Sequence, residues 1–360
     1  MIYRNYGQTG KKVSLLGFGG MRFAHVDDHD ECVRMVIKAA EGGINYFDTA
    51  PGYFETKSET VYGLAFKELD RLKLPYYTAT KTFKTKEDDI RREVEGQLTR
   101  LKKDSIDFYH IWCVTTLDNW TARKKDGILD AFRKLKEEGL IKHICVSSHL
   151  IGGEIETLLM EGVFEGVLFG YSAYNYRTRE KAFNAIRQKH LGAVVMNPLG
   201  GGIIPQNPAL FKFIMREGES AVSAGLRFLW DHQDISVTLV GFGGEDEVAA
   251  ALEAMNGYVP RSGAELEAVK SRGAGFEGIC TGCTYCDDCP QGIPIPRYMD
   301  SYNQKLLKQN GDVELQQRLT MHWSINAAGA GECVECGACE AACTQHIPII
   351  ERLKYIAAMR

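Results

Sequence analysis

The sequence predicts an α/β protein in which a (β/α)₈ TIM barrel precedes a small, cysteine-rich α-helical region. Strand-like and helix-like segments alternate in eight pairs up to about Gly257, and eight of the 11 cysteines fall between residues 280 and 343. A chain of 360 residues is long enough for one large and one smaller domain. We therefore expect domains at residues 1–260 and 261–360.

Each strand-like segment is short and apolar, and apolar residues at helical spacing follow it. Strands that alternate with helices pair in parallel through crossover helices, and eight such units in roughly 250 residues match a closed barrel. An open doubly wound sheet would need a GxGxxG segment after its first strand, and Gly17-Phe18-Gly19-Gly20 does not fit that pattern. The expected strands are 13–18, 44–47, 76–80, 106–111, 143–147, 167–171, 193–196 and 236–240. The expected helices are 29–40, 59–69, 87–101, 128–138, 154–160, 180–189, 221–230 and 247–255.

The segments outside this alternation have simpler patterns. Residues 1–13, with a turn at Gln8-Thr9-Gly10, are expected to form a hairpin that covers the barrel floor. Residues 261–278 are expected to be a linker with one short helix. Helical stretches are expected near 297–307 and 313–325, between and beside the cysteines.

Composition excludes several classes of protein. Apolar residues make up 44% of the chain and charged residues 25%, which is typical of a globular domain. The net charge of −4 argues against a nucleic-acid partner. No apolar run is long enough for a membrane span, and the first ten residues lack a secretory h-region. We therefore expect a cytoplasmic protein.

The cysteines form two compact motifs in which three successive cysteines are spaced two residues apart. Four thiolates hold one [4Fe–4S] cluster, so eight predict two clusters, and the fourth ligand of such a motif often binds the other cluster. We therefore assign Cys280, Cys283, Cys286 and Cys343 to one cluster, and Cys289, Cys333, Cys336 and Cys339 to the other.

Two alternatives to iron–sulfur clusters exist. Disulfides are disfavoured because the chain lacks a secretion signal and its large domain needs no cross-links. Zinc sites use paired Cys-x₂-Cys units, whereas each of the two motifs here contains a run of three cysteines with the spacing Cys-x₂-Cys-x₂-Cys. The first motif is irregular, with two residues before Cys289 where the bacterial ferredoxin run has three. Thr344 stands where a proline often follows the second motif.

Three residues near the ends of the second and third strands suggest acid–base chemistry. Asp48 ends the second strand, Tyr53 follows it, and Lys81 ends the third. Active sites of TIM barrels lie at the carboxyl ends of the strands, so these side chains are expected to converge. An ammonium beside a tyrosine favours the phenolate, and such a tyrosine can protonate a carbonyl oxygen while hydride reaches the carbon.

The expected barrel carries a series of short motifs in order along the chain. They are Leu16-Gly17-Phe18-Gly19-Gly20-Met21, Asp48-Thr49-Ala50 with Tyr53, Ser58-Glu59 and Gly63, Thr80-Lys81, and Leu101 with Asp104-Ser105-Ile106-Asp107-Phe108-Tyr109. With these motifs, the barrel from Tyr3 to about Gly257 resembles the aldo-keto reductase family, and the whole chain resembles the branch with a C-terminal dicluster ferredoxin-like module. The resemblance implies NAD(P)H-dependent carbonyl reduction by an Asp–Tyr–Lys–His tetrad.

The histidine of this tetrad is the position where the chain departs from the family. Asp48, Tyr53 and Lys81 match, but an ungapped comparison places Trp112 at the histidine position. His110 lies two residues earlier on the same strand face, about 6–7 Å deeper. It has two interpretations: a replacement imidazole or a hydrogen-bonded core histidine. His149, after the fifth strand, is a second candidate, although a simple loop histidine is the better explanation there.

The resemblance also implies a nicotinamide site. Ser147-Ser148 matches the family's Ser-Asn pair that holds the carboxamide, and Met196-Asn197 stands where a ring-stacking aromatic is expected. A glycine-rich turn before the last helix can cradle a pyrophosphate. Glu245, Asp246 and Glu247 would repel a 2′-phosphate, which favours NAD(H) over NADP(H), with a flavin as the alternative. The candidate cofactor-binding residues are Gly19, Gly20, Met21, Ser147, Ser148, Asn197, Gly241, Gly243 and Gly244.

The two regions together favour an iron–sulfur oxidoreductase that acts on a small carbonyl or hydroxyl compound. Cubane clusters carry one electron and nicotinamide carries two, so a ferredoxin or another redox protein is an expected partner. One alternative is a lyase, isomerase or dehydratase with structural clusters. Another is an electron-transfer subunit of a larger complex, against which the retained Asp48, Tyr53 and Lys81 argue.

Overall fold

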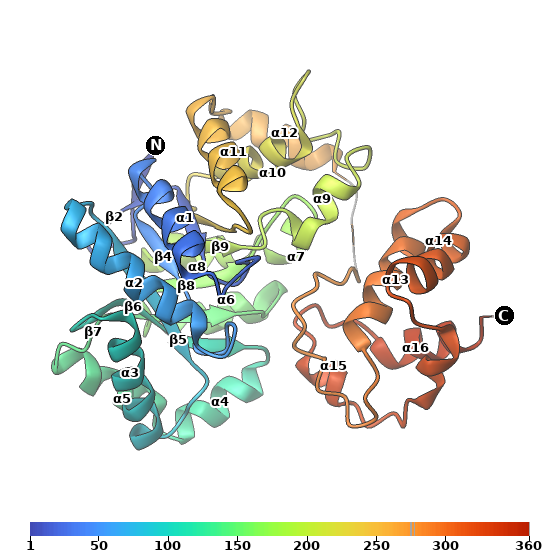
Figure 1. Cartoon of the computed structure of the whole chain (residues 1–360), viewed down its shortest axis with the longest axis horizontal. Helices are drawn as coiled ribbons and strands as arrows, with labels where there is room; N and C mark the ends of the chain where they lie inside the picture. Colours follow the sequence, from blue (N-terminus) through green and yellow to red (C-terminus); the bar gives the residue numbers. More distant parts are fainter. Residues whose placement is uncertain (274–275, 277, 360) are drawn as a thin grey trace. The chain divides into compact units, whose positions relative to one another are not determined.

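Eight parallel strands close into a barrel, which confirms the predicted fold class (Figure 1). A computed structural model of the chain describes residues 1–273, 276 and 278–359. The last strand pairs with the first, with Thr238 beside Leu16, and this pairing closes the sheet. The strands are β3 (Leu16–Gly19), β4 (Tyr46–Asp48), β5 (Tyr77–Thr82), β6 (Ile106–Val114), β7 (Ile141–Ser148), β8 (Gly166–Gly170), β9 (Gly192–Met196) and β10 (Val237–Gly241).

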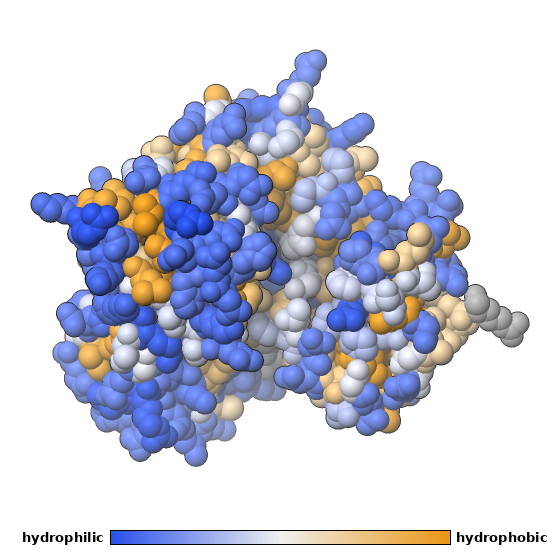
Figure 2. All heavy atoms as spheres, in the orientation of Figure 1, coloured by the Kyte–Doolittle hydropathy of each residue, from blue (hydrophilic) through white to orange (hydrophobic). Residues whose placement is uncertain are grey.

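Helices connect the strands, and several of them bury one apolar face. In α3, Ile90, Val94, Leu98 and Leu101 are buried at helical spacing. The face of the barrel unit visible in Figure 2 carries mostly hydrophilic side chains. The helices of this unit are α1 (His29–Glu41), α2 (Lys57–Leu72), α3 (Glu87–Leu101), α4 (Leu117–Lys125), α5 (Ile128–Glu137), α6 (Gly152–Met160), α7 (Tyr176–Arg179), α8 (Ala182–Lys189), α10 (Ala221–Trp230), α11 (Glu245–Asn256) and α12 (Gly263–Arg272).

The largest departure from the expected elements lies after the fourth barrel strand. β6 extends to Val114 rather than Ile111, and α4 follows it in the segment between residues 111 and 128, for which no helix or strand was expected. The Thr116 hydroxyl caps α4 by accepting a hydrogen bond from the Asn119 N–H (3.0 Å). α4 buries only Trp120 and Arg123, so its sequence shows no apolar stripe.

The floor of the barrel is covered by the hairpin of β1 (Tyr3–Asn5) and β2 (Lys12–Ser14), as expected. The fully buried Tyr6 follows β1 and packs into the barrel core, with 4.1 Å between its ring centre and that of Phe108. A Cβ at Gly166 or Gly192 would lie within 2.2 Å of the Tyr6 side chain, so glycine is required at the start of β8 and β9.

The chain divides into two compact units. The barrel unit comprises Met1–Pro198 and Lys212–Gly273, and the second unit comprises Leu199–Phe211 and the described residues from 276 on. The helix α12 therefore packs with the barrel, where the Tyr176 hydroxyl donates to the Lys270 carbonyl. The expected boundary after residue 260 remains a prediction about folding domains, and the linker expected over 261–278 falls partly outside the described residues.

The second unit is built from short helices around a small apolar core, in which Met299, Leu315 and Leu353 are fully or almost fully buried. The helix expected over 313–325 is a short α-helix followed by a π-helical turn. None of the described helices combines the length and apolar character needed to span a bilayer. The helical segments are α9 (Ile203–Gln206), α13 (Ile295–Leu307), α14 (Gly311–Gln317), η2 (Arg318–His322), η3 (Ala327–Glu332), α15 (Ala338–Ala342) and α16 (Ile349–Ala357).

Candidate active site and cluster-binding sites

A buried ion pair lies at the carboxyl ends of the adjacent strands β4 and β5. Lys81 Nζ donates to Asp48 Oδ1 (2.6 Å) and to the Thr49 carbonyl (2.8 Å). The two charged side chains are each about 1% exposed. The register pairs Asp48 with Ala79, so Lys81 lies two residues further along its strand, toward the barrel rim. This is the edge at which TIM barrels place their chemistry.

Burial and mutual attraction act in opposite directions on this pair. Burial raises the pKa of Asp48 and lowers that of Lys81, because it disfavours both charged forms. The attraction between the two charges opposes both shifts. Asp48 Oδ2 has no hydrogen-bond partner among the described residues, so Lys81 is the main group that compensates this carboxylate.

Tyr53 lies in the loop between β4 and α2, with its ring centre 5.4 Å from Lys81 Nζ. Its ring also packs edge-to-face on Trp112, with 5.8 Å between ring centres. The next three residues, Phe54–Thr56, have φ between 51° and 74°. This left-handed conformation disfavours non-glycine residues by roughly 1–2 kcal/mol each, so the surrounding contacts must hold the loop in place.

Trp112 stands near the end of β6, where the resemblance expects a histidine. Its ring stacks on Phe83 (3.9 Å between centres), and a Cβ at Gly52 would lie 2.9 Å from it. The Arg123 guanidinium donates to the carbonyls of Trp112 and Cys113. Cys113 has φ of 58°, and the pairing of β6 with β7 is irregular here. Arg123 therefore stabilises the irregular end of β6 through these hydrogen bonds, and this strand end places the Trp112 indole beside Tyr53.

His110 lies deeper in the barrel than Trp112. Parallel pairing sets it beside Lys81 on one side and Cys145 on the other, and it is fully buried. Neither ring nitrogen has a hydrogen-bond partner in the part of the chain that the structure describes. Burial, and then the Lys81 charge, lower the pKa of His110 well below its usual value. The imidazole is therefore neutral, and the hydrogen bonds expected of a core histidine are not present among described groups.

The serines and the histidine after β7 are enclosed. Ser147 and Ser148 are almost fully buried, and the Ser148 hydroxyl accepts from the Leu150 N–H (3.2 Å). His149 is 4% exposed, and its backbone N–H donates to the Val114 carbonyl (2.8 Å). Its backbone therefore holds the irregular end of β6.

Asn197 follows β9 and has φ of 57°, a conformation that asparagine tolerates better than most residues. At β3, Gly19 pairs with Gly241, and the Gly20 N–H donates to the Asp48 carbonyl (2.8 Å). A Cβ at Gly20 would lie 2.3 Å from the Ser58 hydroxyl, so this position admits only glycine without rearrangement.

The glycine-rich turn before α11 has the chemistry of an anion site. The Gly243 N–H donates to the Glu247 carboxylate (2.7 Å), which occupies a place that a phosphate oxygen could take. The exposed Arg22, next to the partly buried Met21, lies against Gly241, where a Cβ would be 2.5 Å from its side chain. At Gly244, a Cβ would lie 2.6 Å from Asp246. The residues therefore fit a phosphate group, and Arg22 is a cation that the sequence analysis missed.

The first set of four cysteines lies together in the second unit. The thiols of Cys280, Cys283, Cys286 and Cys343 are close enough to interact electrostatically. Asn303 fixes the loop, because its side chain accepts from the Cys280 N–H (2.9 Å) and donates to the Cys280 carbonyl (2.7 Å). Burial raises the pKa of Cys280 and of Cys286 to about 12. Binding of a metal cluster would displace these thiol protons.

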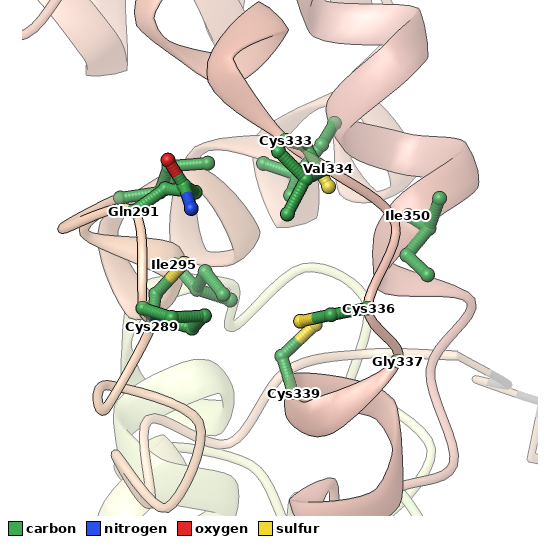
Figure 3. A pocket seen from close by; sticks show the side chains of 12 residues that line it. Cys289, Gln291, Ile295, Cys333, Val334, Cys336, Gly337, Cys339 and Ile350 are labelled. Carbon is green, nitrogen blue, oxygen red and sulfur yellow. The ribbon is translucent and has the colours of Figure 1, made fainter.

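The second set of four cysteines lines a small pocket with a volume of about 10 Å³. Cys289 and Cys333 approach it from two sides, and Cys336 and Cys339 lie together on a third, as Figure 3 shows. Its other lining residues are mainly apolar, among them Ile293, Ile295, Ile350 and Leu353. Four thiols around an apolar space fit the ligand chemistry of a cubane cluster. Their role as ligands, and the partition of all eight cysteines, remain predictions.

Comparisons with known proteins agree with both parts of this description. The model of the aldo/keto reductase family matches residues 15–269, and that of a 4Fe-4S dicluster domain matches residues 279–347. L-galactose dehydrogenase of Arabidopsis thaliana is 29% identical over 287 residues, which cover 69% of this chain and 88% of that protein. An uncharacterized oxidoreductase of Bacillus subtilis, YrpG, is 29% identical over 229 residues, 57% of this chain and 68% of that protein.

The fold is shared with a solved structure, the holo form of aldo-keto reductase AKR11C1 from Bacillus halodurans. The TM-score is 0.67 and the sequence identity is 24%, and the match covers 77% of this chain and 98% of that one. At this identity, the likeness shows a common fold.

Proposed function

The chain belongs to the aldo/keto reductase family and carries a 4Fe-4S dicluster domain, and from this premise we propose that it interconverts a carbonyl group and an alcohol at the barrel rim. Tyr53 is the proposed acid and base, and Lys81 and Asp48 adjust its acidity. The observation that carries this proposal is the Lys81 ammonium, held 2.6 Å from Asp48 and 5.4 Å from the centre of the Tyr53 ring.

In reduction, Tyr53 donates its phenolic proton to the carbonyl oxygen of the substrate. A bound nicotinamide would supply the hydride that the carbonyl carbon accepts. Proton loss leaves a phenolate, which the Lys81 ammonium stabilises, while Asp48 keeps that ammonium in place. In oxidation, the phenolate takes the proton back from the alcohol. Trp112 covers one side of Tyr53 and keeps water from that side of the phenol.

His110 has a proposed supporting role. A neutral, buried imidazole beside Lys81 adds no charge and excludes water from the ammonium, which strengthens the effect of Lys81 on Tyr53. We therefore propose that His110 acts on the catalytic group through Lys81 rather than by contact with substrate.

NAD(H) is the proposed hydride carrier, in preference to NADP(H), with a flavin as the alternative. The pyrophosphate would lie on the turn at Gly241, Gly243 and Gly244, and the nicotinamide near Ser147, Ser148 and Asn197, with Gly19, Gly20 and Met21 along the first strand. Acidic side chains at Glu245–Glu247 argue against a 2′-phosphate. Arg22 offers a cation to the pyrophosphate.

The eight cysteines are the proposed ligands of two [4Fe–4S] clusters, each a carrier of one electron. Nicotinamide delivers two electrons together, so a one-electron partner such as a ferredoxin is proposed for exchange with the clusters. Free thiols of this number need a reducing compartment before cluster assembly, which supports a cytoplasmic location.

One observation favours a second function. Trp112 replaces the expected imidazole, which removes a hydrogen-bond donor to the substrate carbonyl. A barrel with Tyr53 and Lys81 but without hydride transfer would suit a lyase, isomerase or dehydratase, with the clusters as structural elements. Binding and oxidation of NADH separate the two functions.

The test is kinetic and spectroscopic. Anaerobically purified protein should absorb broadly near ~400 nm and contain about eight iron atoms per chain. Tyr53→Phe should lower kcat at least ~10²-fold with unchanged iron content, because the acid is lost and the fold is kept. Tyr3→Phe, a change at an exposed tyrosine of β1, is the control. Full activity of Tyr53→Phe would exclude Tyr53 as acid, and absence of iron would exclude the clusters.

A further inference from the structure

A buried arginine in the second unit has no ionic partner. Arg352, on α16, is only 7% exposed and forms no ion pair with any described residue. Its Nη1 atom is fully buried and has no hydrogen-bond partner among the groups that the structure describes. A buried charge is strongly unfavourable unless an opposite charge compensates it. The site therefore requires an anion that the side chains alone do not supply.

The guanidinium of Arg352 lies close to the loop that carries the first set of cysteines. A Cβ at Gly278, two residues before Cys280, would lie 2.7 Å from Arg352 Nη2. The guanidinium carbon stacks over the Tyr302 ring at 4.6 Å, which fixes the plane of the head group. Arg352 also interacts electrostatically with Cys280 and Cys343, two cysteines from opposite ends of the unit's sequence.

The remaining charge near these cysteines is already paired. Asp300 interacts with Cys280, but its carboxylate accepts from Arg318 (2.7 Å) and from the indole N–H of Trp323 (2.7 Å). The carboxylate of Glu351 also interacts with Arg352, but Glu351 is exposed and forms no ion pair with the guanidinium. No buried anion of the described residues therefore compensates Arg352 beside the first set of cysteines.

We propose that Arg352 is the counter-ion of the cluster bound by Cys280, Cys283, Cys286 and Cys343, and that it raises the reduction potential of that cluster. This inference rests on the proposed ligand set. A [4Fe–4S] cluster with four thiolates carries net negative charge, and one-electron reduction adds another negative charge without a proton. A desolvated guanidinium stabilises the reduced form more than the oxidised form. Burial opposes reduction, and Arg352 offsets that effect at this cluster.

The cysteines around the second cavity have different surroundings. Cys336 is exposed, and the nearby Lys354 on the same helix α16 is paired with Glu335 (2.8 Å) at the surface. Solvent at the exposed Cys336 screens electrostatic interactions, and the charge of Lys354 is already neutralised by Glu335. Removal of the Arg352 charge is therefore expected to affect one cluster and leave the other almost unchanged.

The experiment is a potentiometric titration of the full chain with dithionite as reductant, followed by electron paramagnetic resonance. In Arg352→Gln, the reduced-to-oxidised ratio of one cluster at fixed potential should fall at least tenfold, a shift of ~59 mV for one electron. The other cluster should not shift. Arg352→Lys, which keeps the charge, should restore most of the potential. Lys305→Gln removes a cation that stacks on Tyr355 (4.2 Å) and has no cysteine among its interactions, so it is the matched control.

Unchanged potentials in Arg352→Gln, with two clusters present, would overturn the inference and leave the proposed function intact. Absence of clusters from the wild-type chain would instead overturn the proposed function. If Arg352→Gln does not retain iron, the contact between Arg352 and the cluster can be tested in wild-type protein labelled with ¹⁵N-arginine. One reduced cluster should then show weak ¹⁵N hyperfine coupling. Absence of this coupling from both clusters would exclude the contact.

Discussion

At the scale of the residue, the Asp48–Lys81 pair illustrates why a buried ion pair needs complete hydrogen bonding. Lys81 has two oxygen acceptors, at 2.6 and 2.8 Å, whereas Asp48 has one unpartnered oxygen among the described residues. Burial of both charges costs several kcal/mol each, which the attraction offsets only in this geometry. The pair is thus better suited to fixing an ammonium beside Tyr53 than to stabilising the fold.

Loss of one partner should therefore be more harmful than loss of both. Asp48→Asn or Lys81→Met alone should destabilise the barrel by about 3–5 kcal/mol, because each leaves an uncompensated buried charge. The double variant Asp48→Asn/Lys81→Met should be destabilised by less than either single variant. Denaturant unfolding in a double-mutant cycle measures this, with the exposed pair at Asp130 and Arg133 as the control. Additive effects would show that the two side chains do not depend on each other.

Part of the site could be predicted residue by residue. Asp48 and Lys81 end neighbouring strands of an expected barrel, so their meeting follows from topology alone. The role of Arg123 could not be predicted, because it depends on the left-handed Cys113 and on the irregular end of β6. Non-glycine residues with positive φ carry little sequence signal. Arg22 was missed for a similar reason, since its contact with Gly241 joins the segment after β3 to the end of β10, in distant parts of the chain.

At the scale of the element, apolar periodicity predicted the helices whose faces are clearly amphipathic. The bounds of α3 and α10 agree with the expected ranges, 87–101 and 221–230. α4 was missed because it buries only Trp120 and Arg123, and its remaining residues are polar. Such a helix is stabilised by the packing of a few large side chains rather than by a continuous apolar face. Polar contacts between elements also cannot be predicted from the sequence, and those of Glu165 are an example.

Glu165, before β8, joins three elements. Burial by itself raises its pKa, but hydrogen bonds from His143 Nδ1 (2.7 Å), Lys136 and the Ile144 N–H (3.0 Å) lower it to about 2. Because the folded-state pKa lies below the unfolded value of about 4.3, the unfolded state binds more protons between these values. The carboxylate therefore stabilises the fold above pH ~4.5, and this stabilisation is lost as the pH falls toward 2.

Glu165→Gln should remove this pH dependence. We expect wild-type protein to exceed the variant in free energy of unfolding by on the order of 2 kcal/mol near pH 7. The difference should shrink steadily below pH ~4.5. Urea unfolding followed by circular dichroism at several pH values measures it, and Glu137→Gln, at an exposed position of α5, is the control. A difference independent of pH would mean that the carboxylate charge is not responsible.

At the scale of the whole molecule, alternation of strands and helices was sufficient to predict a closed barrel, and cysteine spacing was sufficient to predict a separate cluster-binding region. The assignment of Leu199–Phe211 to the second unit was not predictable. A Cβ at Gly201 would lie 2.3 Å from the Thr281 carbonyl, so a glycine-rich stretch after β9 packs on the first cysteine loop. Contacts between segments about 80 residues apart leave no periodic pattern.

The two units should respond differently to iron removal. The barrel is closed by eight paired strands, and its core does not involve the clustered cysteines. The second unit has a core of few side chains, against which cysteines pack, and its longest described helix, α13, has 13 residues. Helices of that length are marginal without tertiary contacts. Iron–thiolate bonds that connect Cys280 to Cys343 should therefore provide most of the stability of this unit.

Oxidation with ferricyanide and chelation with EDTA remove the clusters from the full chain. Limited proteolysis should then cleave within residues 276–359 at least tenfold faster than in the loaded protein, since the loss of cluster ligation exposes backbone that the folded unit protects. The barrel should keep its circular dichroism and resist the protease over residues 1–198. Loaded protein under the same protease is the control. Equal protection of residues 276–359 with and without iron would show that the apolar core alone folds the second unit.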